Sequence, residues 1–196
     1  MKKISILFCA MMALSLFSFQ SVNGQKILSG DLKFLKGQGS INVVFDFSGL
    51  KIEKETESEF LAREADERNK KEAGSGDKMK ENWEKDKTER FVAGFVKILK
   101  EDLGIPVEDA NAKYTLVVYN INLTNKGWGN KFSGGNPASM EVDFKFVETG
   151  NQNSALCELR EEHARYMATG GTISQKIQGC LEYAAHQLVK SMKKNM

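Results

Sequence analysis

The sequence predicts an α+β fold with a single four-stranded, largely antiparallel sheet and helices packed on one face. Several segments alternate apolar and polar residues, as half-buried strands do. Two other segments open with a capping box, which marks a helix start. The polar strand positions suit a sheet with one open face. With 196 residues, 41% of them hydrophobic and 28% charged, the chain has room for one globular domain.

The first 24 residues have the pattern of an export signal. Lys2 and Lys3 precede an apolar stretch over residues 4–19, and the chain then turns polar. Small residues stand at the positions that a signal peptidase reads, namely Val22 and Gly24. The sequence therefore predicts a signal peptide over 1–24, cleavage before Gln25, and a secreted or periplasmic protein.

Two other interpretations of this segment fit less well. The apolar stretch is shorter than the ~20 residues of a membrane-spanning helix. Acylation at Cys9 would need a small residue before it, and Phe8 is bulky. The mature chain, residues 25–196, would keep 26 of the 28 basic residues beside 26 acidic ones. This balance gives no reason to expect a nucleic-acid partner, and we expect the mature protein not to span a membrane.

The mature chain is expected to form one domain whose first half is strand and then helix. Residues 25–40 suggest an extended lead-in, and 41–47 alternate as a strand. Residues 51–90 hold 13 acidic and 11 basic residues, which predicts a charged helical segment. A capping box at Thr56 starts its first helix, and a second helix is expected to run from Asp77 to about Leu103.

The second half is expected to supply three strands and a closing helix. The strands are predicted over 114–123, 140–147 and 155–164 from their alternation and their β-favouring residues. A capping box at Thr172 opens the last helix. A 15-residue loop, 124–138, connects the first two of these strands and is long for such a connection.

The order of these elements resembles known periplasmic modules. The motifs VKILKEDLG (96–104), AKYTLVV (112–118) and FVETG (146–150) are similar to the amino-terminal domain of the Tol-Pal protein TolB and to the curli-secretion lipoprotein family. Two further motifs, GDLKFLKGQ (30–38) and NVVFDFS (42–48), resemble a family of uncharacterised secreted proteins of gut-dwelling Gram-negative bacteria. These resemblances imply an envelope location and carry over no catalytic residue.

The residues that carry catalytic or metal chemistry are sparse. Cys157 and His163 lie six apart, about 20 Å along a straight strand, so they cannot form a nucleophilic pair. Cysteine and histidine spacings fit no zinc site, and we expect no cofactor. Cys157 and Cys180 are expected in the core and could form a disulfide in an oxidising compartment.

The 124–138 loop is the candidate binding site. Its aromatic, amide and basic side chains stand among four glycines, and such loops often serve recognition. The candidate residues are Trp128, Asn130, Lys131 and Phe132. The alternative is that Trp128 and Phe132 fold back onto the edge of the core.

The sequence thus favours an exported envelope or secreted binding module without catalytic activity. Its partner would be an envelope protein or a glycan. The alternative is a small exported hydrolase that uses carboxylates on the open sheet face, such as Glu141 and Asp143 or the adjacent Glu161 and Glu162. Acidic side chains that converge in a concave pocket would favour the hydrolase.

Overall fold

A mixed eight-stranded sheet forms the centre of the computed structural model, which describes residues 21–22, 25–124, 138–166 and 171–196. The strands run β1-β2-β8-β7-β6-β4-β5, and β3 pairs with β6 beside β4. Their bounds are Ser21–Val22 (β1), Gln25–Gly30 (β2), Asn42–Phe45 (β3), Lys51–Ile52 (β4), Glu55–Thr56 (β5), Tyr114–Thr124 (β6), Ala138–Glu148 (β7) and Asn151–Tyr166 (β8).

The predicted α+β class is confirmed, but the single four-stranded sheet is wrong. The four expected strands are present as β3, β6, β7 and β8, and β6, β7 and β8 pair antiparallel as predicted. The sheet adds β2 within the expected lead-in and three strands of two residues each. It also contains two parallel pairings, of β3 and of β4 with β6. Two-residue strands are too short to show a period of two, so only their partners identify them.

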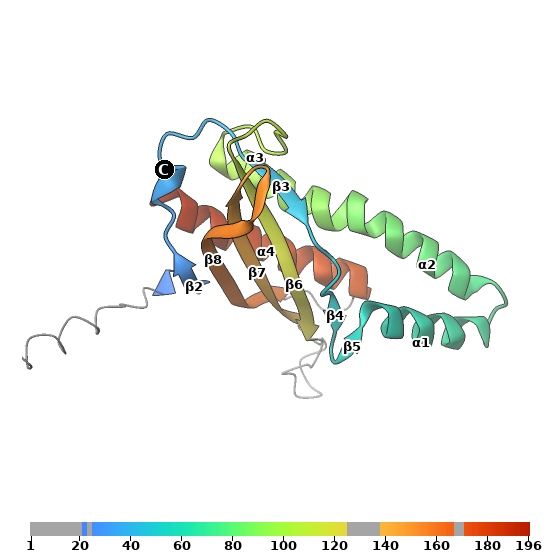
Figure 1. Cartoon of the computed structure of the whole chain (residues 1–196). Helices are drawn as coiled ribbons and strands as arrows, with labels where there is room; N and C mark the ends of the chain where they lie inside the picture. Colours follow the sequence, from blue (N-terminus) through green and yellow to red (C-terminus); the bar gives the residue numbers. More distant parts are fainter. Residues whose placement is uncertain (1–20, 23–24, 125–137, 167–170) are drawn as a thin grey trace, which may run out of the picture.

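The helices lie along one face of the sheet and beyond its end. They are α1 (Glu57–Asn69), α2 (Ser75–Asp86), a π-helical segment (Lys87–Val92), α3 (Ala93–Leu103) and α4 (Ile173–Lys193), and a short 3-10 turn covers Lys33–Leu35. Both predicted capping boxes are present, at Thr56 and at Thr172. Helix α4 packs on β7 and β8, and α3 packs on α4, as Figure 1 shows.

The core lies between these two helices and the sheet. Alternate residues of β7 face it and are at most 1% exposed: Met140, Val142, Phe144 and Phe146. A bulge in β6 at Asn120, whose φ of 55° is left-handed, keeps Ile121 and Leu123 on the same buried side. Helix α3 ends at Gly104, whose φ is 69°, as the sequence predicted.

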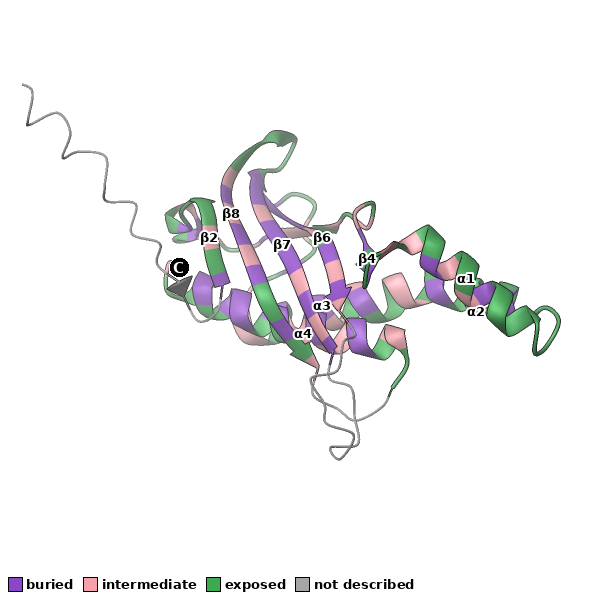
Figure 2. Cartoon of the chain, turned by 90° about the horizontal axis from the view of Figure 1, so that it is seen from below, coloured by how far each residue is buried: buried purple, intermediate pink, exposed green. Residues whose placement is uncertain are grey.

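Helices α1 and α2 form a hairpin that projects past the end of the sheet, here called the arm (residues 57–86). Figure 2 shows that exposed residues dominate its outer part. At its tip the two helices approach closely, because Gly76 lies against Ala65 and its N–H donates to the Asn69 side chain at 2.8 Å. The charged helical segment thus forms a two-helix projection.

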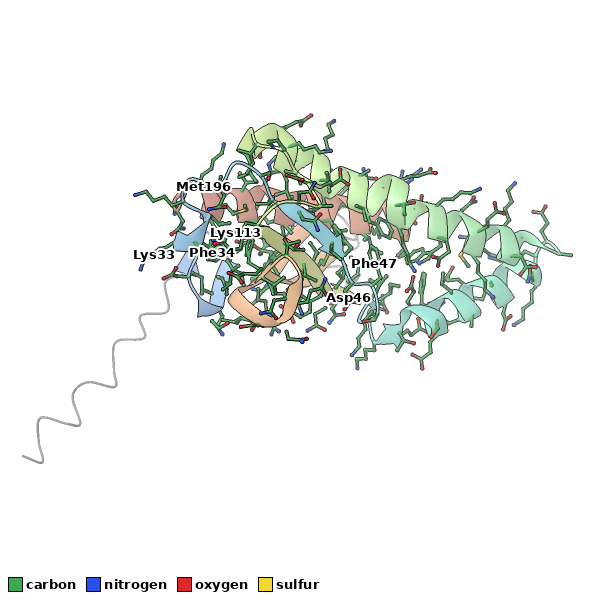
Figure 3. All side chains as sticks on the ribbon, turned by 45° about the horizontal axis from the view of Figure 1, so that its top comes forward. Lys33, Phe34, Asp46, Phe47, Lys113 and Met196 are labelled. Carbon is green, nitrogen blue, oxygen red and sulfur yellow. The ribbon has the colours of Figure 1, made fainter. Side chains whose placement is uncertain are left out.

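A chain of aromatic rings connects the arm to the core. Neighbouring ring centroids are 5.3–6.4 Å apart. In order along the chain of contacts, the rings are Phe60, Trp83, Phe91, Phe47, Phe45, Phe95 and Phe144. Figure 3 shows Phe47 where the arm joins the sheet. Such ring pairs contribute about 0.5–1.5 kcal/mol each beyond their burial, so the arm is held in a defined direction.

Candidate functional site: the groove beneath the arm

The predicted binding loop cannot be placed against the fold. Trp128, Asn130, Lys131 and Phe132 lie outside the described residues, which resume at Ala138. The strands that this loop joins, β6 and β7, are adjacent and antiparallel. The last described residue before the loop, Thr124, and the first one after it, Ala138, therefore lie at the same end of these two strands.

Cys157 and Cys180 are buried, as predicted, but they are free thiols and not a disulfide. Cys157 is the cross-strand partner of Phe146, whereas the Cys180 thiol lies 3.8 Å from the carbonyl oxygen of Ala138. Residues 138 and 146 lie at opposite ends of β7, about 26 Å apart at the usual rise. A disulfide needs Cα atoms within about 7 Å, so the disulfide that the sequence allowed between Cys157 and Cys180 is not formed.

On the open face of the sheet, the central carboxylate, that of Asp143, is already engaged in hydrogen bonds with other side chains. Asp143 accepts two hydrogen bonds from the Arg160 guanidinium, at 2.6 and 2.8 Å, and one from the Asn120 amide at 2.9 Å. Its side chain is only 3% exposed, and Glu141 makes a second, longer ion pair with Arg160. These carboxylates hold three strands together, and the hydrogen bonds to Asp143 raise the pKa of Arg160.

The adjacent carboxylates Glu161 and Glu162 are not a pair. A bulge in β8 sets two residues, 162 and 163, opposite Glu141 alone. Glu161 lies before the bulge, continues the buried alternation of Cys157 and Leu159, and is 1% exposed, whereas the bulged Glu162 and His163 are exposed. The acidic side chains proposed for a hydrolase thus separate to opposite sides of the sheet.

A concavity with a volume of about 770 Å³ lies beneath the arm. We call it the arm groove. One wall is the inner side of α1 and α2, and the other is the start of α4, residues 171–176. Aromatic and thioether side chains line its arm side, namely Phe60, Met79 and Trp83, and charged residues of both signs surround them: Glu64, Arg68, Lys85, Asp86, Glu89 and Arg90.

The charges around the groove are only partly neutralised. Arg90 pairs with Asp86 at 2.7 Å, and Lys85 pairs with Glu81 at 2.7 Å. Arg68 is exposed and makes no salt bridge with a described residue. Surface pairs of this kind are weak, at about 0–1 kcal/mol, so these charges can be re-paired with a partner at little cost.

The base of the arm is fixed by Glu57. Its carboxylate accepts a hydrogen bond from the Trp83 indole N–H and forms an ion pair with the Lys87 ammonium. Burial alone would lower the pKa of Lys87, but the hydrogen bonds from its ammonium to Glu57 and Glu84 outweigh burial and raise that pKa. Lys87 also lies 5.6 Å from the centre of the Phe47 ring, so one cation joins α1, the π-helical segment and the connection between β3 and β4.

Sequence reasoning missed the arm groove because its walls are distant along the chain. The only local signal was the thin apolar side of the charged segment, which includes Phe60 and Met79. Such a side is typical of a solvated helix, and it identifies a groove only once α4 is placed opposite.

No described group of three or more His, Cys, Asp or Glu residues is arranged to hold a metal ion. No described helix is long and apolar enough to cross a membrane.

Comparisons with known proteins found distant structural similarity. No protein-family model matches the chain, and no curated protein matches it. A dodecameric variant of PelC from Paraburkholderia phytofirmans has 12% identity and a TM-score of 0.37, over 85% of this chain and 98% of that one. The PelC dodecamer in another crystal form has 10% identity and a TM-score of 0.35, over 83% and 96% of the two chains. TM-scores this low carry no argument about what this chain does.

Proposed function

We propose that this protein is an exported, non-catalytic module that binds another protein of the cell envelope through the arm groove. The observation that carries the proposal is the groove itself, where half-buried Met79 and the edges of Phe60 and Trp83 lie among charges of both signs. The signal pattern of residues 1–24 supports export.

The chemistry of the groove favours a polypeptide over a polyanion or a glycan. Cations and carboxylates alternate around it, and a polyanion would be repelled by Glu64, Asp86 and Glu89. A partner helix with an apolar stripe and charges of both signs would complement it, which is the helix-in-groove mode of recognition. A glycan remains the competing outcome of the test below.

The arm supports this role because it is both projecting and rigid. It reaches past the sheet, so a partner can approach both of its helices (Figure 1). The aromatic chain and the contacts of Glu57 hold it in place, which lowers the entropy lost on binding.

The open-face hydrolase is the weaker candidate. Catalysis by two carboxylates needs an acid and a base that converge on an accessible reacting atom. Asp143 instead points into hydrogen bonds with Arg160 and Asn120, and Glu161 faces the helices. We therefore expect no turnover from these carboxylates.

Site-specific photo-crosslinking in the native cell would test the groove directly. A photoreactive amino acid replaces Asn82, an exposed residue of the groove, or Lys80, an exposed residue of α2 outside the groove. Side chains two residues apart on a helix differ by about 200° in direction, so the probes at positions 80 and 82 point to nearly opposite sides of α2. We expect one envelope protein to crosslink to position 82 and not to position 80.

A charge-reversal pair then measures the contribution of the groove to binding. Arg68→Glu should weaken binding of the captured protein by about tenfold, whereas Lys80→Glu should leave binding unchanged. Equal crosslinking from both positions, or capture of saccharide alone, would refute a protein-binding groove.

A further inference from the structure

A buried carboxylate oxygen without a partner lies between β8 and α4. It is Oε2 of Glu161, a residue that is 1% exposed. Oε1 of the same carboxylate accepts a hydrogen bond from the His163 N–H at 3.0 Å. Burial raises the pKa of this group, because a charged carboxylate loses its hydration there. Folded proteins rarely leave such an oxygen unpaired. The carboxamide Nε2 of Gln25 is also buried without a partner, so the Gln25 side chain does not supply the donor that this oxygen lacks.

The residue opposite Glu161 is Gln25, the residue expected to begin the mature chain. The two are cross-strand partners in the antiparallel pair of β2 and β8, so their Cα atoms lie about 4.5–5.5 Å apart. Gln25 is fully buried, and its Oε1 accepts a hydrogen bond from the Ser191 hydroxyl of α4 at 2.9 Å. This contact anchors the first residue of β2 to the last turns of α4.

The Glu161 side chain bends toward the end of β8 that lies beside the start of β2. It bends along β8 to reach the N–H of His163, two residues further on. Since β2 runs antiparallel to β8, the main-chain nitrogen of Gln25 lies toward the same end of the strand pair as His163. In the uncleaved chain this nitrogen belongs to a neutral peptide group. In a chain that begins at Gln25 it is an ammonium, which carries a positive charge and three donors.

We propose that removal of residues 1–24 creates the missing donor, because the new α-ammonium of Gln25 pairs with Glu161 and locks β2 onto β8 and α4. Signal peptidase would hydrolyse the Gly24–Gln25 amide, with the hydroxyl of water added to the Gly24 carbonyl carbon and the proton to the Gln25 nitrogen. This inference rests on the export part of the proposed function and is independent of the arm groove.

The charged and titratable residues around Glu161 do not supply the donor that we assign to the new terminus. On β8 its charged neighbours are Glu162 and His163, which are both exposed. On β7, Glu141 lies opposite the bulge and pairs with Arg160. On β2, Lys26 is the partner of Arg160 on the other side of the sheet. On α4 the contact with Gln25 is the neutral Ser191, and Lys190 beside it is exposed.

Two forms of the chain test the proposal, each with Glu161 and with Glu161→Gln. One form begins at Gln25 and the other begins at Ser21, so that its ammonium lies four residues away. Both are released by an engineered protease site, and intact mass confirms that Gln25 has not cyclised. Because the forms are made in vitro, a failure of native export or of partner binding does not affect the result.

We expect Glu161→Gln to shift the urea midpoint of the two forms in opposite directions. At neutral pH, Glu161→Gln should lower the urea midpoint of the form that begins at Gln25, because it removes an ion pair. The same substitution should raise the midpoint of the form that begins at Ser21, because it removes an unpaired buried charge. Glu162→Gln, an exposed neighbour, should move the two forms alike. Equal shifts of both forms by Glu161→Gln would overturn the proposal.

A pH series with Glu161 intact gives a second readout if a variant fails to fold. An α-ammonium that gains a partner has a raised pKa, so its contribution to stability is lost as pH rises beyond about 8. The form that begins at Gln25 should therefore lose urea midpoint over this range relative to the form that begins at Ser21. Parallel pH profiles of the two forms would also contradict the pairing.

Discussion

The indole nitrogen of Trp83 donates a hydrogen bond of 2.6 Å to the carboxylate of Glu57, and this contact joins the two helices of the arm at their base. Trp83 is 4% exposed, and its ring centre lies 5.7 Å from that of Phe60, in a tilted arrangement, and 5.7 Å from that of Phe91, edge to face. Its ring is therefore a wall of the arm groove and also a part of the aromatic chain to the core. The direction of the arm depends on this residue.

Trp83→Phe should loosen the base of the arm. The change keeps an aromatic ring but removes the donor to Glu57, and a hydrogen bond to a charged group contributes about 1.5–3 kcal/mol. We expect the free energy of unfolding, from urea titration followed by circular dichroism, to fall by about 2 kcal/mol. Tyr183→Phe, which removes the hydroxyl of an exposed aromatic residue of α4, serves as the control. An arm whose amide exchange is unchanged in Trp83→Phe would contradict this role.

Gly76→Ala should force α1 and α2 apart at the tip of the arm. A Cβ atom at residue 76 would lie 2.5 Å from the carbonyl oxygen of Ala65, which is backbone and cannot turn away. Overpacking of this kind costs about 1–3 kcal/mol. Gly39→Ala is the matched control, because nothing lies within 4 Å of its new methyl group. Equal urea midpoints for the two variants would show that the helices do not approach so closely.

Arg160→Met should destabilise the sheet because it leaves Asp143 buried without its cation. Loss of one member of a buried pair costs about 3 kcal/mol or somewhat less here, since Arg160 is 31% exposed at its side chain. The double variant Asp143→Leu with Arg160→Met removes both charges and should recover most of the loss. Thermal unfolding of the two variants and the parent protein measures this difference. A double variant no more stable than Arg160→Met would mean that Asp143 is tolerated alone.

The two thiols should resist alkylation in the folded chain. Burial raises the pKa of Cys157 and of Cys180 to about 12, from 9.0. The unfolded chain therefore loses these protons first, and stability should fall as pH rises from about 9 toward 12. Mass spectrometry after iodoacetamide treatment, with and without urea, checks the protection. Rapid labelling of either thiol in the folded chain would show that its site opens readily.

The 124–138 loop gives a prediction that competes with the groove. If the loop takes part in recognition, Trp128→Ala with Phe132→Ala should weaken partner binding and change stability little. Two large apolar side chains can contribute about 2 kcal/mol or more each at an interface. Titration calorimetry with the purified partner that crosslinking identifies compares the binding affinity of this variant with that of Arg68→Glu. A large drop in the urea midpoint would instead place both aromatics in the core.

Much of the architecture could be predicted from local signals. The capping boxes at Thr56 and Thr172 start helices where expected, and Gly104 ends one. The alternation in residues 140–147 placed the correct side of β7 in the core. These features depend on residues within a few positions of one another, so the sequence alone determined them.

Other features depend on partners far along the chain, and only the tertiary structure decided them. Strand β2 exists because β8 pairs with it, and the two cysteines lie far apart because they meet opposite ends of β7. The bulge in β8 puts both Glu162 and His163 on the exposed side and returns Ala164 to the core, which no alternation pattern reveals. The arm groove forms only when α4 meets the arm. Sequence spacing therefore determined the elements and their buried sides, whereas the contacts between distant segments decided which side chains meet.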